Sequence, residues 1–247
     1  MCGRVEHYVA AAGHGAVASL FALGALPAGV VPGPAVRVAV TALMAAGAVP
    51  MSGGRWSPDI DQFKDPWKKW DRRIPDELLL FGGPLKHRGI SHFWGIPAAL
   101  TYLLWLACGR LPLAGAVLLL VLAWPLLAGW WSHLISDFFV GARYAGGKRP
   151  EADDPAGAWD RKSMLDADDH PRGPGIPLFP WWGHVGLGWR VGSVAEWVYV
   201  LTTVAVGVAA GYGAWRGVVL PFDVRVVGVV VAGMLALGMA GRVKGRH

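Results

Sequence analysis

Eight ionisable residues, each an imidazole or a carboxylate, interrupt or border the apolar stretches of this sequence. They are His14, Asp59, Asp61, His87, His92, His133, Asp137 and Glu196. Ionisable side chains are costly inside a membrane, so their presence beside apolar stretches indicates a functional site. Nitrogen and oxygen ligands without thiolate suit zinc, manganese or iron. The two cysteines, Cys2 and Cys108, are too few for a disulfide framework or a cysteine-rich zinc finger.

The spacing of these residues fits metal ligation. His133 and Asp137 are four residues apart, so on a helix both point the same way. Asp59 and Asp61 would lie on one side of an extended turn, and His87-Arg-Gly-Ile-Ser-His92 places two imidazoles around a turn at the start of a helix. The predicted metal ligands are His14, Asp59, Asp61, His87, His92, His133 and Asp137. They exceed the four ligands of one tetrahedral zinc, so we expect one or two divalent ions, zinc first and manganese or iron as alternatives.

The elements that must position these residues are apolar helices. The chain has 247 residues, 54% of them hydrophobic and only 16% charged, which argues against an ordinary soluble domain. About 20 apolar residues are needed to cross a bilayer as a helix. The candidate stretches are Tyr8–Val31, Val36–Met51, Phe93–Gly109, Leu111–Val140, Val194–Gly213 and Val218–Ala240. The predicted fold class is therefore all-α, a polytopic membrane bundle of about six spans that forms a single domain over residues 1–247.

The basic residues predict the orientation of this bundle. With six spans, only four of the 23 lysines and arginines fall on one side, namely Arg37, Arg110, Arg216 and Arg225. The positive-inside rule then makes the other side cytoplasmic, with both termini and the long loops 52–92 and 141–192. We expect a multi-pass protein of the cytoplasmic (inner) membrane, with all candidate ligands toward one face. The net charge of +6 indicates attraction to anionic lipid, and no nucleic-acid partner is expected because acidic residues alternate with basic ones in both loops.

Each candidate also has a purely structural interpretation. His14 could pack between helices, Asp59 and Asp61 could cap a helix, and His133 could hydrogen-bond across spans. The set as a whole carries the metal prediction. His7, like His170 and His247, is expected to be exposed and not to bind metal.

Four motifs in fixed order carry a family resemblance. They are Gly13-His14, Pro58-Asp-Ile-Asp61, His87-Arg-Gly-Ile-Ser-His92 and Ser132-His-Leu-Ile-Ser-Asp137, followed by Gly175-Ile-Pro-Leu-Phe-Pro180 and a Gly192-Ser193 element with Glu196. In this order the chain resembles the YdjM-like family of membrane-bound metal-dependent hydrolases, some described as LexA-binding and inner-membrane-associated. The resemblance covers roughly residues 13–196. Gln62 stands where the family often has histidine, so one ligand would be lost or replaced.

The resemblance implies hydrolase activity, and the residues suggest how it would proceed. A metal-activated water would attack a phosphoester or lipid-linked substrate at the cytoplasmic face. Asp61 or Asp137 would serve as general base. Arg88 would contact an anionic substrate oxygen, because guanidinium matches phosphate geometry. Ser91 would orient a ligating histidine, and Glu196 is an additional site candidate.

Two other classes of function remain open from the sequence. A transporter or channel could use a polar His/Asp site inside the membrane, because such residues mark proton and ion paths. A membrane-tethered interaction protein would bind a protein partner without any metal. Metal content separates the hydrolase from the interaction protein, and a polar path through the outer half of the membrane would favour the transporter. Membrane lipid is an expected partner in every case.

Overall fold

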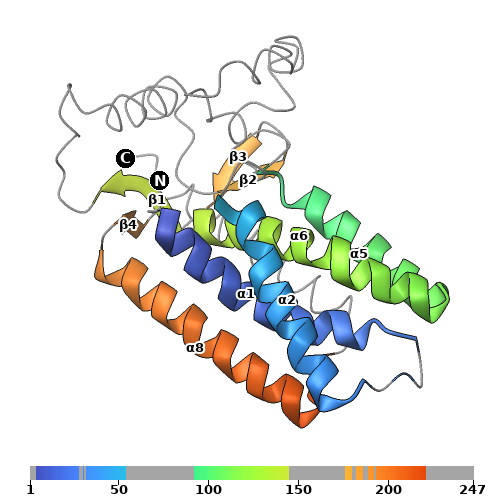
Figure 1. The fold of residues 1–247 in the computed structure, drawn as a ribbon. Coiled ribbons are helices and arrows are strands. Elements are labelled where there is room, and N and C mark those ends of the chain that lie inside the picture. The colour runs from blue at the N-terminus through green and yellow to red at the C-terminus, as the bar shows by residue number, and fades with distance from the viewer. Residues whose placement is uncertain are drawn as a thin grey trace, which may run out of the picture.

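The computed structural model describes residues 4–27, 30, 32–53, 92–144, 176–179, 182–185, 189–191 and 193–220, and all structural statements below concern this part of the chain. It contains five long helices: α1 (Arg4–Gly24), α2 (Pro34–Gly53), α5 (Gly95–Arg110), α6 (Leu113–Phe139) and α8 (Val194–Arg216). Helices α1, α2 and α6 pack against one another, α5 packs on α6, and α8 packs on α1 and α2 (Figure 1). The prediction of a helical fold is confirmed.

Three of these helices are long and apolar enough to cross a membrane. They are α2 over Pro34–Ser52, α6 over Leu113–Phe139 and α8 over Val194–Arg216. The stretches predicted over Tyr8–Val31 and Phe93–Gly109 also form helices, but α5 has only 16 residues. The sixth predicted span lies almost entirely outside the described residues, so the six-span topology stays a prediction.

The outer faces of the helices are apolar and the inner faces carry small side chains. Leu103 of α5, Leu122 of α6 and Val208 of α8 are 59%, 59% and 70% exposed. A water-soluble bundle would place polar residues there, whereas a lipid-facing surface is as apolar as the core. Between the helices the buried residues include many alanines, together with Met44 and Trp124. This distribution fits a bundle surrounded by lipid.

Two glycines allow the helices to approach closely. A Cβ at Gly13 of α1 would collide with the backbone carbonyl oxygen of Thr203 in α8. A Cβ at Gly129 of α6 would collide with the carbonyl oxygen of Ala48 in α2. Small residues at such crossings let membrane helices pack through their backbones. The glycine beside His14 therefore has a packing role.

The helix ends follow from local chemistry. Helix α1 ends at Gly24, earlier than the predicted boundary at Val31, because Pro27 disfavours helical conformation in the residue before it. Helix α8 begins at the N-cap Ser193, whose hydroxyl accepts a hydrogen bond from the backbone N–H of Glu196. It ends at Gly217, which adopts a left-handed φ of 89°.

Arg37 of α2 binds the end of α8 that Gly217 caps. Its guanidinium donates to the carbonyl oxygens of Ala214 at 2.6 Å and Trp215 at 3.0 Å. These carbonyls belong to the last turn of α8, which carries the negative end of the helix dipole, and the carbonyl of Ala214 also accepts the backbone N–H of Gly217 at 3.1 Å. This arginine therefore ties the start of α2 to the end of α8.

Four short strands lie in the stretch 140–191, which the sequence analysis treated mainly as a long loop. β1 (Val140–Tyr144) pairs in parallel with β4 (Trp189–Val191), and β2 (Ile176–Phe179) pairs antiparallel with β3 (Trp182–Val185). The all-α prediction therefore holds for the bundle but missed these strands. Strands of three to five residues are too short to produce a recognisable alternation of polar and apolar residues. Figure 1 shows them together beside one end of the helices.

Candidate metal centre

Helix ends from distant parts of the sequence meet at the end of the bundle that carries the strands. Helix α6 reaches this end with its last two turns, which contain His133 and Asp137. Helix α5 starts here, and His92 lies three residues before its first residue, Gly95. Helix α2 finishes here at Ser52 and Gly53. The polar residues of the candidate site therefore come from the termini of helices, whose middle segments are apolar.

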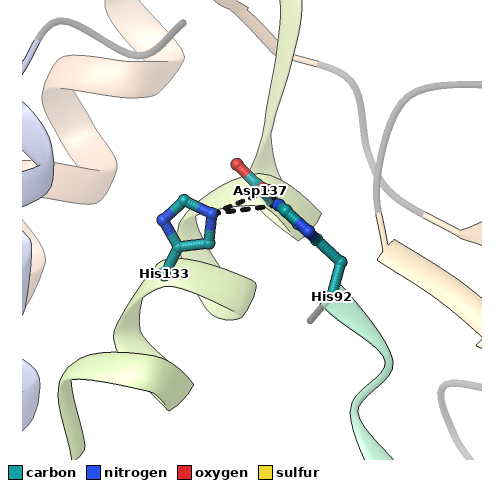
Figure 2. Close-up of side chains that lie close together, drawn as sticks. All are labelled: His92, His133 and Asp137. Carbon is teal, nitrogen blue, oxygen red and sulfur yellow. Dashed lines mark hydrogen bonds and ion pairs between the residues drawn. The ribbon is translucent and has the colours of Figure 1, made fainter. Parts of the chain in front are cut away.

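His92, His133 and Asp137 form the group in the described residues that could hold a metal ion (Figure 2). The Nε2 atoms of the two histidines are 3.2 Å apart. The Oδ2 atom of Asp137 lies 3.4 Å from each of these nitrogens. Both histidines are fully buried, whereas the side chain of Asp137 is 16% exposed. The predicted i, i+4 pair on α6 thus points toward a histidine 41 residues earlier in the chain.

These three separations match the geometry of ligands around one ion. Zinc binds histidine nitrogen and carboxylate oxygen at about 2.0–2.2 Å, so two ligands of a tetrahedral site lie about 3.4 Å apart. The observed separations of 3.2, 3.4 and 3.4 Å are the edges of such a site. Three protein ligands leave a fourth position for water or substrate, which is the pattern of a catalytic zinc. The group could therefore bind a metal ion.

A backbone carbonyl determines which nitrogen of His133 faces the other ligands. The Nδ1 atom of His133 lies 2.6 Å from the carbonyl oxygen of Ser52. Because a carbonyl only accepts, Nδ1 must carry the hydrogen, and a neutral ring then has its lone pair on Nε2. A histidine that ligates a metal commonly donates its other N–H in this way. His133 is thus held in the orientation and tautomer that ligation requires.

His14 lies beside this group but contacts a different side chain. Its Nδ1 atom is 2.8 Å from the hydroxyl of Ser132, the residue before His133. The ring of Tyr199 on α8 lies 6.0 Å from the ring of His14, centroid to centroid, and the Tyr199 hydroxyl bonds Ser136 at 2.9 Å. His14 was predicted to be a metal ligand. It lies near the group of His92, His133 and Asp137 but is not one of its three members.

The expectation that His7 is exposed was wrong. His7 is 7% exposed, and its ring stacks on the ring of His133 with centroids 5.3 Å apart and planes 20° apart. His7 and His14 are seven residues apart, so they lie on the same face of α1, and both contact α6, through His133 and Ser132 respectively. This seven-residue spacing is the feature of the sequence from which the burial of His7 could have been predicted.

Several predicted site residues lie outside the described residues. They are Asp59, Asp61, His87, Arg88 and Ser91, as well as Gln62. Glu196 is described and is 1% exposed in the first turn of α8. It lies outside the three-residue metal group, and its backbone N–H donates to the hydroxyl of the N-cap Ser193. Ser52 and Ser132 are site neighbours that the sequence analysis did not single out as such.

Comparison with known proteins adds no further information about this site. No protein-family model, curated protein or solved structure matches the chain. The resemblance to the YdjM-like family therefore remains a prediction from the motifs.

Proposed function

We propose that this chain is a membrane-bound, metal-dependent hydrolase whose centre includes His92, His133 and Asp137. The observation that carries the proposal is the convergence of two imidazole Nε2 atoms and one carboxylate oxygen at the separations of a tetrahedral site. Two of the three ligands are fully buried at the end of an otherwise apolar bundle. Burying ionisable groups in an apolar bundle costs free energy, so their presence there indicates a function.

The proposed reaction uses a water on the fourth position of the ion. A divalent metal lowers the pKa of its bound water toward about 7 and so supplies hydroxide at neutral pH. Asp137 would hold the ion through Oδ2, which leaves Asp61 as the preferred general base. Arg88 would bind an anionic oxygen of the substrate. A second ion, if bound, would use His14, Asp59 or His87, with Ser91 orienting a ligand.

The membrane setting suggests the class of substrate. The centre lies at the end of helices that include three long and apolar enough to cross a membrane. In the six-span topology this end faces the cytoplasm, where loop 52–92, which has eight basic and six acidic residues, would attract phosphate groups. We therefore propose a phosphoester or lipid-linked substrate in the cytoplasmic leaflet of the inner membrane. The same topology places both termini in the cytoplasm.

Elemental analysis of the detergent-purified protein tests the proposal. We expect about one or two equivalents of zinc, manganese or iron per chain, because the seven predicted ligands are enough for one ion or for two. His92→Ala and His133→Ala should each lose at least one equivalent and all hydrolase activity, because each removes a ligand. His247→Ala is the matched control, since this histidine is expected to lie outside the site.

A metal-free wild-type protein, even after incubation with zinc, manganese and iron salts, would contradict the proposal. It would favour an interaction protein that needs no ion. Retained metal and activity in both alanine variants would also overturn it, because the ligands would then lie elsewhere.

A further inference from the structure

We propose that Ser52 is a positioning residue of the metal centre, through which the end of α2 orients His133. This inference rests on the proposed function, because it concerns the affinity of the same ion. Ser52 was not among the candidates from the sequence. We do not propose that it contacts the substrate or the ion; it would act entirely by orienting His133.

The carbonyl group of Ser52 is suited to this task by its place in α2. Helix α2 spans Pro34–Gly53, so Ser52 is its penultimate residue. The last four carbonyl groups of a helix lack intrahelical donors and carry the negative end of the helix dipole. The Nδ1–H of His133 satisfies this carbonyl at 2.6 Å. A donor held by a partial negative charge makes the opposite nitrogen, Nε2, a better metal ligand.

The hydroxyl group of Ser52 fixes the position of this carbonyl. It donates to the carbonyl oxygen of His7 in α1 at 3.3 Å and lies 3.5 Å from the hydroxyl of Ser132 in α6. Ser132 is in turn 2.8 Å from Nδ1 of His14. Ser52 and Ser132 are both fully buried. The Ser52 side chain therefore links the end of α2 to α1 and to α6, the helix that carries His133.

A second buried serine at the α1–α2 interface separates positioning from packing. Ser19 is fully buried, and its hydroxyl lies 2.8 Å from the hydroxyl of Thr41 in α2. It also donates to the carbonyl oxygen of Ala16 at 2.6 Å. Ser19 thus joins α1 to α2, as Ser52 does, but at the other end of α1 from His7, the residue that Ser52 contacts. Its removal should affect helix packing without affecting His133.

The test compares zinc affinity in the full-length wild-type protein and in Ser52→Ala, Ser132→Ala and Ser19→Ala. Zinc binding is measured by competition with a chromogenic chelator, and the thermal unfolding of each metal-free protein is recorded beside it. We expect Ser52→Ala to weaken zinc binding by up to about tenfold, the lower end of the effect of losing an outer partner, because the carbonyl is kept and only the hydroxyl that fixes it is lost. Ser132→Ala, which removes the α6 side of the link, should change affinity in the same direction. Ser19→Ala should keep wild-type affinity.

Substitution of zinc by cobalt gives a readout that general destabilisation would not change. The visible absorption of bound cobalt reports ligand geometry, so it should shift in Ser52→Ala and stay the same in Ser19→Ala. Wild-type affinity and spectrum in both Ser52→Ala and Ser132→Ala would overturn the positioning role and leave the proposed function intact. Equal weakening in Ser19→Ala would also overturn it, because the effect would then be one of packing. Failure of the wild-type protein to bind zinc or cobalt would instead refute the proposed function.

Discussion

Two residues of the candidate metal centre, His133 and Asp137, are in different physical situations. His133 has its Nδ1 engaged by a backbone carbonyl, whereas Asp137 is the member with access to the surroundings, at 16% exposed. The side of the cluster formed by Asp137 is therefore where water or substrate would approach. Asp137 also supplies the negative charge that the two imidazoles lack. Removing this charge should weaken the attraction of the site for a cation while leaving its shape intact.

Asp137→Asn should lose most of the stabilisation that zinc gives to the protein. A ligand at 100 times its dissociation constant stabilises the folded state by about 2.7 kcal/mol, and one bound 100-fold more weakly would contribute only about 0.4 kcal/mol. Asparagine has nearly the same shape, so the metal-free variant should unfold close to the wild-type temperature. Thermal unfolding with and without zinc measures both quantities. Asp169→Asn, outside the predicted site, serves as control, and an unchanged zinc shift in Asp137→Asn would show that Oδ2 is not a ligand.

At the scale of elements, the site depends on how closely α2 approaches α6. Gly129 of α6 packs directly on the backbone of Ala48, about one helical turn before Ser52. Gly47 of α2 meets Pro125 of α6, where an added Cβ would lie 2.6 Å from the Cβ of the proline. These two close contacts within the crossing of α2 and α6 bring the end of α2 to His133. The glycines therefore influence the centre without belonging to it.

Gly129→Ala should destabilise the bundle and weaken metal binding together. The added methyl group would overlap Ala48, and overpacking of this kind costs about 1–3 kcal/mol. Gly115→Ala on the same helix is the control, because its Cβ would meet Leu111 at an ordinary 3.4 Å. That change should be neutral or slightly stabilising, since alanine is the better helix former. Thermal unfolding and zinc affinity of both variants check the expectation, and equal effects at the two positions would contradict it.

At the scale of the whole molecule, the two ends of the bundle differ in chemistry. The histidine and aspartate cluster lies at one end, and three isolated arginines mark the other. Arg37 lies in the first turn of α2, Arg110 ends α5 and Arg216 ends α8. The helices between these ends present apolar side chains outward, as Leu118 at 58% and Leu201 at 63% exposed show. This distribution fits a membrane protein whose two ends carry different ionisable groups.

Cysteine labelling in intact cells tests which end faces the cytoplasm. In a background with Cys2 and Cys108 changed to serine, Gly33→Cys lies between α1 and α2 at the arginine end. Val194→Cys lies at the site end and is 80% exposed. The positive-inside rule predicts that an impermeant maleimide labels position 33 in intact cells and position 194 only after permeabilisation. The reverse pattern would place the metal centre outside the cell and contradict the proposed orientation.

The sequence by itself determined where the described helices lie and which of their residues could bind metal. Apolar length located α2, α6 and α8, and the spacing of His133 and Asp137 placed both on one face of α6, because these are local properties of a chain. The tertiary structure decided what depends on packing between distant segments. It brought His92 to His133, buried His7, and turned the carbonyl of Ser52 toward a histidine ring 81 residues away. A backbone carbonyl has no signature in a sequence, since every residue carries one, and only the crossing of α2 and α6 selects the one at Ser52.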